Sequence, residues 1–276
     1  MLDDECVQFL QWSLPQLHMQ WQGFRKVRAQ VCKRIARRMK QLGLAGITDY
    51  RRYLDEYADE WHVLDSLCQV TISRFYRDKL MFIFLAQEVL PALAQQALEQ
   101  ERDYLKVWSA GCGSGEEPYS IALLWQLQLQ ARFPGLHLRI VATDTNPDLL
   151  QRVSKACYPY ASIKNLPVVW RDAIFSEQAD QYCLKPDYRA NLRIIRQDVR
   201  ATMPTETFDL ILCRNLVFTY YDDDLQCAVL QRLQGVLRSG GALVIGIHEH
   251  LPTGVSGLME WAAKMRIYRK VIPAVG

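Results

Sequence analysis

The sequence predicts an α/β protein in which an all-helical N-terminal domain, residues 1–90, precedes a doubly wound, mostly parallel sheet domain, residues 91–276. Residues 1 to about 90 hold few glycines or prolines and space their aliphatic residues by three and four, as helices do. From about residue 104, short apolar runs of strand length alternate with helical segments. This alternation is typical of a doubly wound fold.

The clearest N-terminal helix is the basic segment "FRKVRAQVCKRIARRMKQLGL", residues 24–44. Its apolar residues fall on one stripe at helical spacing, namely Val27, Val31, Ile35, Met39 and Leu42. Four basic residues project roughly opposite to that stripe, namely Lys26, Lys33, Arg37 and Lys40. We expect Gly43 to end the helix, because glycine tolerates the left-handed conformation found there.

The positive charge of the chain is concentrated in this segment. Between Cys6 and Thr48 there are eight basic residues and no acidic one, although the whole chain has a formal net charge of only +3. The basic face is therefore a solvated helix face, a docking surface for an acidic helical protein, or a contact surface for RNA or membrane phosphates. Lys26, Lys33, Arg37 and Lys40 are the candidate docking residues.

Four apolar runs predict the strands of the second domain. After a long helix at "DKLMFIFLAQEVLPALAQQALEQER", which Pro91 can interrupt, the runs are "YLKVWSAG", "LRIVATD", "FDLILCRN" and "GALVIGI". Their continuous hydrophobicity indicates strands buried on both faces of a parallel sheet. The alternating stretch around a Lys-Pro-Asp turn signal predicts a small β insertion at about 180–199.

A glycine loop follows the first of these strands and precedes a helix. In "KVWSAGCGSGEEPYS", Gly111, Gly113 and Gly115 let a nucleotide-like ligand approach the backbone. A dinucleotide fingerprint would place its third glycine at Glu116, and that carboxylate would repel a pyrophosphate bound there. The loop therefore disfavours NAD.

S-adenosylmethionine suits this loop better than a dinucleotide does. It carries no phosphate, a cationic sulfonium and an ammonium group, so that Glu116 and Glu117 beside the loop attract it. Asp144, about 30 residues further on at the end of a strand, is placed to bind the ribose hydroxyls. The alternative is that the two glutamates only stabilise the first turn of a helix.

The cysteines and the N-terminus indicate a cytoplasmic protein without a metal site. The eight cysteines form no CxxC pair, so we expect reduced, mostly buried thiols rather than zinc ligands or disulfides. The N-terminus "MLDDECVQFL" lacks the basic segment of a secretory signal. We find no apolar run that approaches the length of about 20 residues needed to span a bilayer, and we expect no membrane insertion.

Several motifs together make the sequence resemble the CheR family, the chemotaxis-receptor protein-glutamate methyltransferases. "VWSAGCGSGEEPYSIAL" resembles the family's nucleotide loop, "IVATDTNPDLL" its ribose-binding strand end, and "FDLILCRNLVFTYY" its fourth-strand motif. "SRFYRD" at 73–78 resembles the element that closes the family's helical N-terminal domain. The resemblance covers most of the chain. It implies a seven-stranded sheet that binds S-adenosylmethionine, and O-methylation of glutamate side chains in a chemoreceptor or a related signalling protein.

The resemblance also assigns cofactor-binding residues. It implies that Ser73 and Arg77 contact the cofactor or line the reactive centre, and that Glu116 or Glu117 holds its methionine end. Asp144 is implied at the ribose, and Arg214 and Asn215 face the site. The family's His-Asn-Leu contact falls at Gln197, Asp198 and Val199, where Asp198 keeps an acceptor near the adenine.

The candidate catalytic residues are Arg77, Arg214 and Tyr220. A glutamate acceptor is already ionised at neutral pH, so no general base is needed, and an arginine can orient its carboxylate. Thr219 occupies the position of a site tyrosine of the family, and Tyr220 follows it. This departure leaves two alternatives: a methyltransferase of another acceptor, such as RNA or another protein, or a non-catalytic cofactor-sensing or scaffolding protein.

The expected partner is an acidic helical protein, namely the cytoplasmic domain of a chemoreceptor; DNA is not expected, and RNA is less favoured. His248 and Glu249 end the last strong strand at the ligand-binding edge. Either these two side chains contact the site directly, or their hydrogen bonds are satisfied within the protein at the end of the strand.

Overall fold

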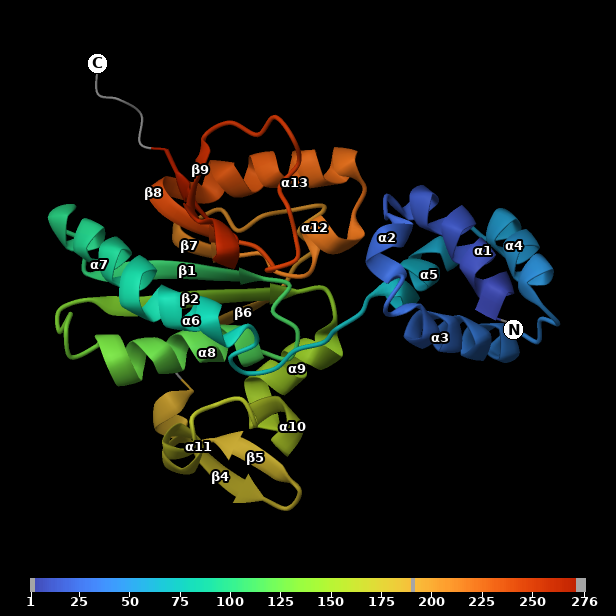
Figure 1. Cartoon of the computed structure of the whole chain (residues 1–276). Helices are drawn as coiled ribbons and strands as arrows, with labels where there is room; N and C mark the ends of the chain where they lie inside the picture. Colours follow the sequence, from blue (N-terminus) through green and yellow to red (C-terminus); the bar gives the residue numbers. More distant parts are fainter. Residues whose placement is uncertain (1–2, 190–191, 272–276) are drawn as a thin grey trace. The chain divides into compact units, whose positions relative to one another are not determined.

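The structure is a computed structural model that describes residues 3–189 and 192–271 (Figure 1). The chain divides into two compact units. The N-terminal unit contains the described residues up to Thr71 together with Thr219–Gln226, and the sheet unit contains Ile72–Phe218 and the described residues from Cys227 onward. The sequence placed the boundary at residue 90. That position is corrected to residue 71, because the apolar helix that begins at Lys79 contributes to the core of the sheet unit.

The N-terminal unit is helical, as the sequence predicted. Its helices are α1 (Asp3–Ser13), η1 (Leu14–Leu17), α2 (Trp21–Phe24), α3 (Arg28–Gln41), α4 (Ile47–Glu56) and α5 (Glu60–Cys68). Three members of the predicted stripe, Val31, Ile35 and Met39, lie in α3 and are buried, whereas Val27 and Leu42 flank the helix and are half-buried. Gly43 has a left-handed φ of 70°, and the N–H of Leu44 donates to the carbonyl of Met39, so the helix ends in a Schellman turn.

The basic residues of α3 fall into two classes. Arg38 forms a bidentate ion pair with the buried carboxylate of Glu60, with Nη2 and Oε2 2.6 Å apart, and the hydroxyl of Tyr50 also donates to Glu60. Burial alone would raise the pKa of Glu60, but the hydrogen bonds from Arg38 and Tyr50 outweigh it and lower that pKa. These contacts give Arg38 a structural role.

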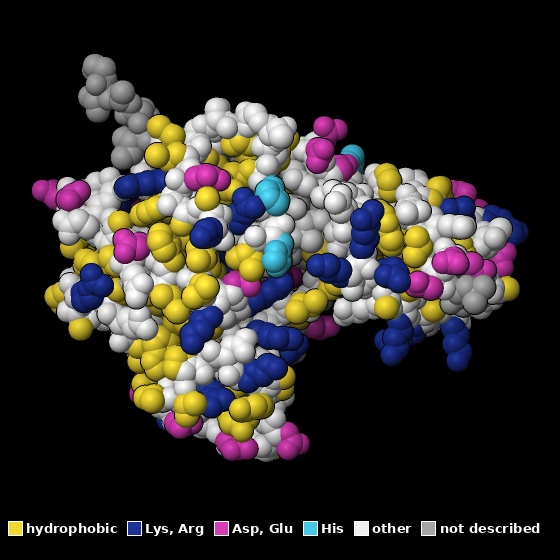
Figure 2. Space-filling view, in the orientation of Figure 1, with side chains coloured by type: hydrophobic (Ala, Val, Ile, Leu, Met, Phe, Trp, Pro, Cys, Tyr) yellow, Lys and Arg dark blue, Asp and Glu magenta, His cyan; other side chains and the backbone are white. Residues whose placement is uncertain are grey.

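The second class consists of exposed cations. The four candidate docking residues Lys26, Lys33, Arg37 and Lys40 are all exposed; Lys26 lies in the turn before α3, and the other three lie on the helix. Figure 2 shows basic side chains projecting from the N-terminal unit in the region of α3. These residues form a cationic face whose charge is available to a partner.

The sheet unit is built on a seven-stranded sheet, and the predicted fold class is confirmed. Its strands are β1 (Tyr104–Ala110), β2 (His137–Asp144), β6 (Leu192–Arg196), β7 (Phe208–Leu212), β8 (Leu237–Val244), β9 (Leu258–Ala262) and β10 (Ile267–Lys270). They lie in the order β6-β2-β1-β7-β8-β10-β9. The first five are mutually parallel, whereas β10 runs antiparallel to both of its neighbours. The carboxyl ends of the five parallel strands therefore share one edge.

Helices cover both faces of this sheet. They include α6 (Lys79–Phe84), η2 (Leu85–Val89), α7 (Leu90–Glu99), α8 (Glu116–Leu124), η3 (Trp125–Leu129), α9 (Pro147–Lys155) and α13 (Asp223–Val236). The short helix α12 (Val217–Tyr220) spans the boundary between the two units. A short turn of helix, η5 (Ala263–Met265), joins β9 to β10. In Figure 1, α7 and α8 lie on one side of the sheet and α13 on the other. This is the doubly wound arrangement that the alternating pattern predicted.

The stretch Lys79–Glu99 is a core helix with a defect at Pro91. Because proline has no N–H to donate, the preceding turn η2 is π-helical, and the N–H of Leu90 donates to the carbonyl of Leu85. By length and composition this stretch could cross a membrane, so the expectation that no run reaches that length is wrong. Half of its most apolar window is buried, and Phe82 and Leu93 belong to the core cluster. These are the properties of a core helix in a globular unit.

The β insertion lies earlier in the chain than predicted. A three-stranded sheet consists of β3 (Cys157–Tyr158), β5 (Gln181–Leu184) and β4 (Phe175–Gln178), in that order, with α10 (Tyr160–Ile163) and α11 (Val168–Ile174) between its strands. The span 180–199, where we expected a hairpin, instead contributes β5 to the small sheet and β6 to the main sheet. Between them the Lys-Pro-Asp signal forms a 3-10 turn, η4 (Pro186–Tyr188). Pairing partners lie far apart in sequence, so local alternation could not assign them.

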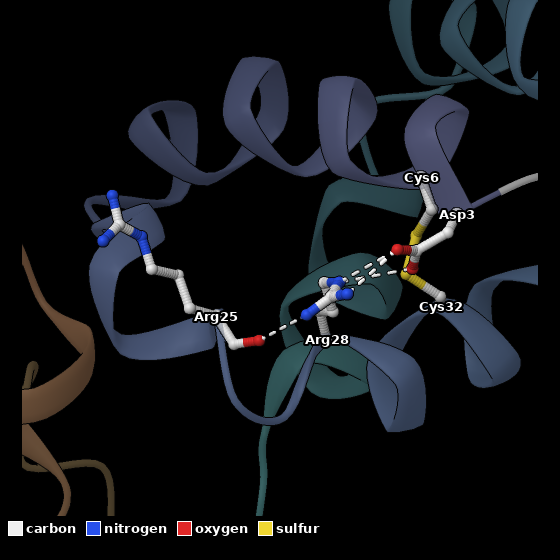
Figure 3. Close-up of a disulfide and its surroundings, with 5 residues drawn as sticks. All are labelled: Asp3, Cys6, Arg25, Arg28 and Cys32. Atoms are coloured by element: carbon white, nitrogen blue, oxygen red, sulfur yellow. Dashed lines mark hydrogen bonds and ion pairs between the residues drawn. A yellow bond between two sulfur atoms is a disulfide. The ribbon is translucent and has the colours of Figure 1, made fainter.

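Four of the eight cysteines form disulfides, which corrects the expectation of reduced thiols. Cys6 of α1 is joined to Cys32 of α3 (Figure 3), and Cys157 of β3 is joined to Cys183 of β5. Beside the first disulfide, Arg28 pairs with Asp3. Both disulfides join cysteines 26 residues apart in sequence. Helix packing brings the first pair of cysteines together, and strand pairing brings the second pair together. A search for cysteines close together in sequence cannot detect such pairs.

Candidate active site

The glycine loop connects β1 to α8 at the carboxyl edge of the sheet. Gly111, Gly113 and Gly115 have φ angles of 73°, 58° and 94°, a region that favours glycine over every other residue. A Cβ at Gly115 would lie 2.9 Å from a methyl carbon of Val153, so space as well as conformation requires glycine there. The loop is thus tightly packed backbone that leaves no room for a side chain at Gly111 or Gly115.

Asp144, at the end of β2, is tied directly to this loop. Its carboxylate accepts N–H groups from Gly113, at 2.9 Å, and from Asn146, at 3.0 Å. The loop is held again where the N–H groups of Gly111 and Cys112 donate to the carbonyl of Thr143. Burial raises the pKa of Asp144, although its hydrogen bonds with backbone N–H groups oppose the shift. The carboxylate is only half-buried and can accept further hydrogen bonds.

The two adjacent glutamates at the start of α8 have different hydrogen-bond partners. Glu116 is buried; its Oε1 accepts from the hydroxyl of Ser162 at 3.3 Å, and its Oε2 has no hydrogen-bond partner in the described part of the chain. Glu117 accepts from the hydroxyl of Ser109 at 2.7 Å and forms an ion pair with Arg214 at 2.9 Å. Glu117 is therefore the glutamate that is joined to Arg214.

Arg214 is the centre of a buried ion-pair cluster. Its side chain is only 2% exposed, and its guanidinium pairs with Glu117 on one side and with Asp78 on the other, at 2.5 Å. The same guanidinium donates to the carbonyl of Arg77 and lies over the ring of Phe82. These contacts tie Arg214 to α8 and to the segment before α6, and its catalytic role stays a prediction.

Arg77 and Asn215 form a chain of hydrogen bonds beside this cluster. The guanidinium of Arg77 donates to Oδ1 of Asn215 at 3.0 Å and to the carbonyl of Ile72 at 2.6 Å. Asn215 has a left-handed φ of 54°, and its N–H donates to the carboxylate of Glu249 at 2.9 Å. Glu249 also accepts from the N–H of Gly246. Glu249 is therefore a buried acceptor at the strand end, whereas His248 is exposed.

The remaining predicted cofactor residues lie at the same edge of the sheet or beside Arg77. Val199 is buried three residues after the end of β6. Both carboxylate oxygens of Asp198 already accept from the side chain of Arg200, at 2.8 Å for the shortest contact. Ser73 is half-buried in the segment before α6. The adenine-binding role expected for Asp198 stays a prediction. The guanidinium of Arg200 neutralises the charge of the Asp198 carboxylate.

Tyr220 belongs to the N-terminal unit, whereas Arg77 and Arg214 belong to the sheet unit. Its ring centroid lies 5.0 Å from that of Phe24, and its carbonyl accepts from the N–H of Gln20 at 2.8 Å. A Cβ at Gly23 would overlap the carbonyl of Thr219, so this approach requires glycine. The segment that departs from the family pattern is thus packed among the N-terminal helices, and the catalytic role of Tyr220 stays a prediction.

The geometry of the sheet unit fits S-adenosylmethionine. The glycine cradle accepts a flat, closely packed ligand, and the half-buried Asp144 offers acceptors for two hydroxyls. Glu116 and Glu117 place two acidic side chains in the first turn of α8, where they would repel a pyrophosphate. In the described ranges 3–189 and 192–271 no group of histidine, cysteine or acidic residues is arranged to hold a metal ion.

Comparison with known proteins decides the family. The family model described as "CheR methyltransferase, SAM binding domain" matches residues 71–266. The chain belongs to the CheR methyltransferase family. A chemotaxis protein methyltransferase of Listeria monocytogenes is 36% identical over 186 residues, which cover 67% of this chain and 68% of the relative. A probable chemotaxis protein methyltransferase of Rhizobium etli is 32% identical over 228 residues, which cover 80% of this chain and 84% of the relative.

A more distant relative matches a similar share of the chain. The chemotaxis protein methyltransferase of Escherichia coli is 28% identical over 243 residues, covering 81% of this chain and 77% of the relative. The family and the cofactor expected from the motifs are confirmed: the chain is an S-adenosylmethionine-dependent methyltransferase of the CheR family.

Sequence reasoning missed two residues that contact the predicted site residues. Asp78, which pairs with Arg214, directly follows Arg77 in the "SRFYRD" element, and an acid beside a predicted site arginine was a usable signal. Ser109 lies inside an apolar strand, and nothing in its local pattern marks it as a partner of Glu117.

Proposed function

We propose that this CheR-family enzyme O-methylates glutamate side chains in the cytoplasmic domain of a chemoreceptor, producing a methyl ester and S-adenosylhomocysteine. The observation that carries the proposal is the composition of the arginine cluster. Its carboxylates are held in ion pairs, and none of the five histidines lies in the glycine loop or the strand-four motif. An acceptor that is already ionised, with a side-chain pKa of about 4.3, needs no base.

The proposed division of labour follows from the contacts. The glycine loop holds the cofactor against the backbone, Asp144 its ribose, and Glu117 its methionine end. When bound, S-adenosylmethionine supplies a methyl group on a cationic sulfonium that a carboxylate oxygen can displace. Arg77, which is less enclosed than Arg214, orients the acceptor carboxylate, and Arg214 positions Glu117 and Asp78. Rate enhancement then comes from holding the reacting atoms roughly 3 Å apart and excluding water.

Labelling identifies the bond that is formed. The enzyme is incubated with a purified chemoreceptor cytoplasmic domain and cofactor tritiated in the methyl group. We expect protein-bound label that mild alkali releases as volatile methanol, because carboxyl methyl esters hydrolyse there and N-methyl groups do not. Replacement of the acceptor glutamates by alanine is the control and should abolish incorporation. Alkali-stable label, or label removed by nuclease, would contradict the proposal.

The cationic face of α3 is proposed to dock the acidic receptor. Exposed Lys26, Lys33, Arg37 and Lys40 offer a row of positive charge, whereas Arg38 is engaged within the unit by Glu60. Charge complementarity of this kind mainly accelerates encounter and sets the orientation of the partners. The helical, acidic surface of a receptor is the partner that this face would recognise.

Reversing the charge of this face should affect the acceptor and not the cofactor. For K33E/R37E we expect kcat/KM for the receptor to fall about tenfold at low salt, with S-adenosylhomocysteine affinity unchanged. Salt screening should shrink the difference between variant and wild type. The control is R132E/K264E, which replaces two exposed cations of the sheet unit and changes the net charge of the protein by the same amount. An equal loss in both variants would mean that net charge alone matters.

A further inference from the structure

We infer that Tyr158 is a positioning residue for the cofactor: its hydroxyl fixes the carbonyl of Ser114 and with it the shape of the glycine loop. Tyr158 ends β3, the short strand of the small sheet, and lies 44 residues from Ser114 in sequence. The inference rests on the proposed role of the loop as the cofactor cradle. It assigns a task within the sheet unit to the small β insertion.

The contact is direct and buried. The hydroxyl of Tyr158 donates to the carbonyl of Ser114 at 2.9 Å, and the Tyr158 side chain has no exposed surface. Ser114 lies between Gly113 and Gly115, and a Cβ placed at Gly115 would be 3.1 Å from the same hydroxyl. The phenol oxygen therefore lies against the backbone of the loop.

This hydrogen bond restrains the part of the loop whose backbone rotates most easily. Glycine residues on both sides of Ser114 allow the intervening peptides to rotate at low cost. Asp144 holds the loop through the N–H of Gly113, and Tyr158 holds the next residue through its carbonyl. Without the hydroxyl, a buried carbonyl would lose a donor, and the loop could turn that carbonyl toward the space intended for the ligand.

Tyr158 is itself held rigidly. Its ring packs edge-on against Phe75, with centroids 4.9 Å apart, and against Tyr119. β3 is fixed to β5 by the Cys157–Cys183 disulfide, and the N–H of Leu184 donates to the carbonyl of Ala156. Because Tyr158 is held in this way, its hydroxyl keeps the glycine loop at a fixed distance from the small sheet.

The structure provides a matched control in Tyr119. This residue is also buried, lies in the same aromatic group, and donates its hydroxyl to a backbone carbonyl, that of Val153 in α9, at 3.1 Å. Each Tyr→Phe change removes one buried hydroxyl and one hydrogen bond to a carbonyl. Of the two hydroxyls, only that of Tyr158 donates to the glycine loop; Tyr119 contacts the loop through its backbone N–H, which Y119F leaves in place.

The test compares Y158F with Y119F in the full chain. We expect Y158F to weaken S-adenosylhomocysteine binding about tenfold in calorimetry, and to raise KM for S-adenosylmethionine with little change in kcat. Y119F should bind within twofold of wild type while losing a similar amount of thermal stability. Amide hydrogen exchange at residues 111–115 should increase in Y158F only; this measurement also reports on the loop if Y158F is partly unfolded.

The outcomes separate the inference from the assignment of the cofactor site. If wild type binds S-adenosylhomocysteine, D144A does not, and Y158F binds as wild type does, then the role of Tyr158 is wrong and the cofactor site stands. Equal losses in Y158F and Y119F would also overturn it, because they would reflect stability alone. If D144A binds as tightly as wild type, the assignment of the loop itself fails.

Discussion

Replacing Arg214 by alanine should lower kcat/KM for methyl transfer by about 100-fold or more and cost about 3 kcal/mol of unfolding free energy. The guanidinium is 2% exposed and lies between two carboxylates, those of Glu117 and Asp78, which are themselves largely buried. Its removal leaves both acids close to one another without their shared cation. Repulsion and desolvation would then displace the first turn of α8 and the Arg77 segment together. Steady-state kinetics and urea unfolding measure the two effects.

The control for this prediction is another buried ion pair in the same unit. Arg102 pairs with Asp209 at 2.8 Å, with side chains 12% and 2% exposed. The pair lies at the amino ends of β1 and β7, opposite to the glycine loop. R102A should destabilise the protein to a similar degree, yet keep kcat/KM at a temperature where it is folded. R214K, which keeps charge but not the planar fork, should fall between wild type and R214A. An R214A enzyme with nearly normal kcat/KM would reduce Arg214 to a stability residue.

Local patterns predicted the parts of the fold that local physics determines. The buried stripe of α3, its end at Gly43, and the four apolar strand runs follow from side-chain periodicity and glycine conformation, which neighbouring residues fix. The glycine loop was predictable for the same reason, because a strand, three glycines and a helix are consecutive in the chain.

Features that depend on distant partners were not predictable. The disulfide Cys157–Cys183 requires knowledge that β3 and β5 pair, and no short spacing signals it. The sequence offered Arg214 as a group to orient the acceptor, but its two ion pairs come from residues 97 and 136 positions away. Only tertiary structure reveals that two acids converge on this arginine, and the catalytic role of Arg214 stays a prediction.

Replacing Asp144 by alanine should weaken S-adenosylhomocysteine binding at least 100-fold. The carboxylate both fixes the loop through the N–H of Gly113 and is proposed to accept the two ribose hydroxyls. Hydrogen bonds to a charged group are worth about 1.5–3 kcal/mol each, and each 1.4 kcal/mol is a tenfold change in affinity. Isothermal titration calorimetry measures the effect directly. D148A removes an exposed acid four residues away, on α9, and should bind as wild type does.

The same carboxylate should make cofactor affinity depend on pH. Burial raises the pKa of Asp144 above the ordinary value of an aspartate, about 3.9. Only the ionised form offers all its oxygen lone pairs, so affinity is complete above the raised pKa and declines as pH falls through it. D144N has no proton to gain; it should bind more weakly than wild type at pH 7 and lose less of its affinity as the pH falls from 7 into the acid range. If the D144N profile has the wild-type slope, another group titrates and the carboxylate of Asp144 does not control binding.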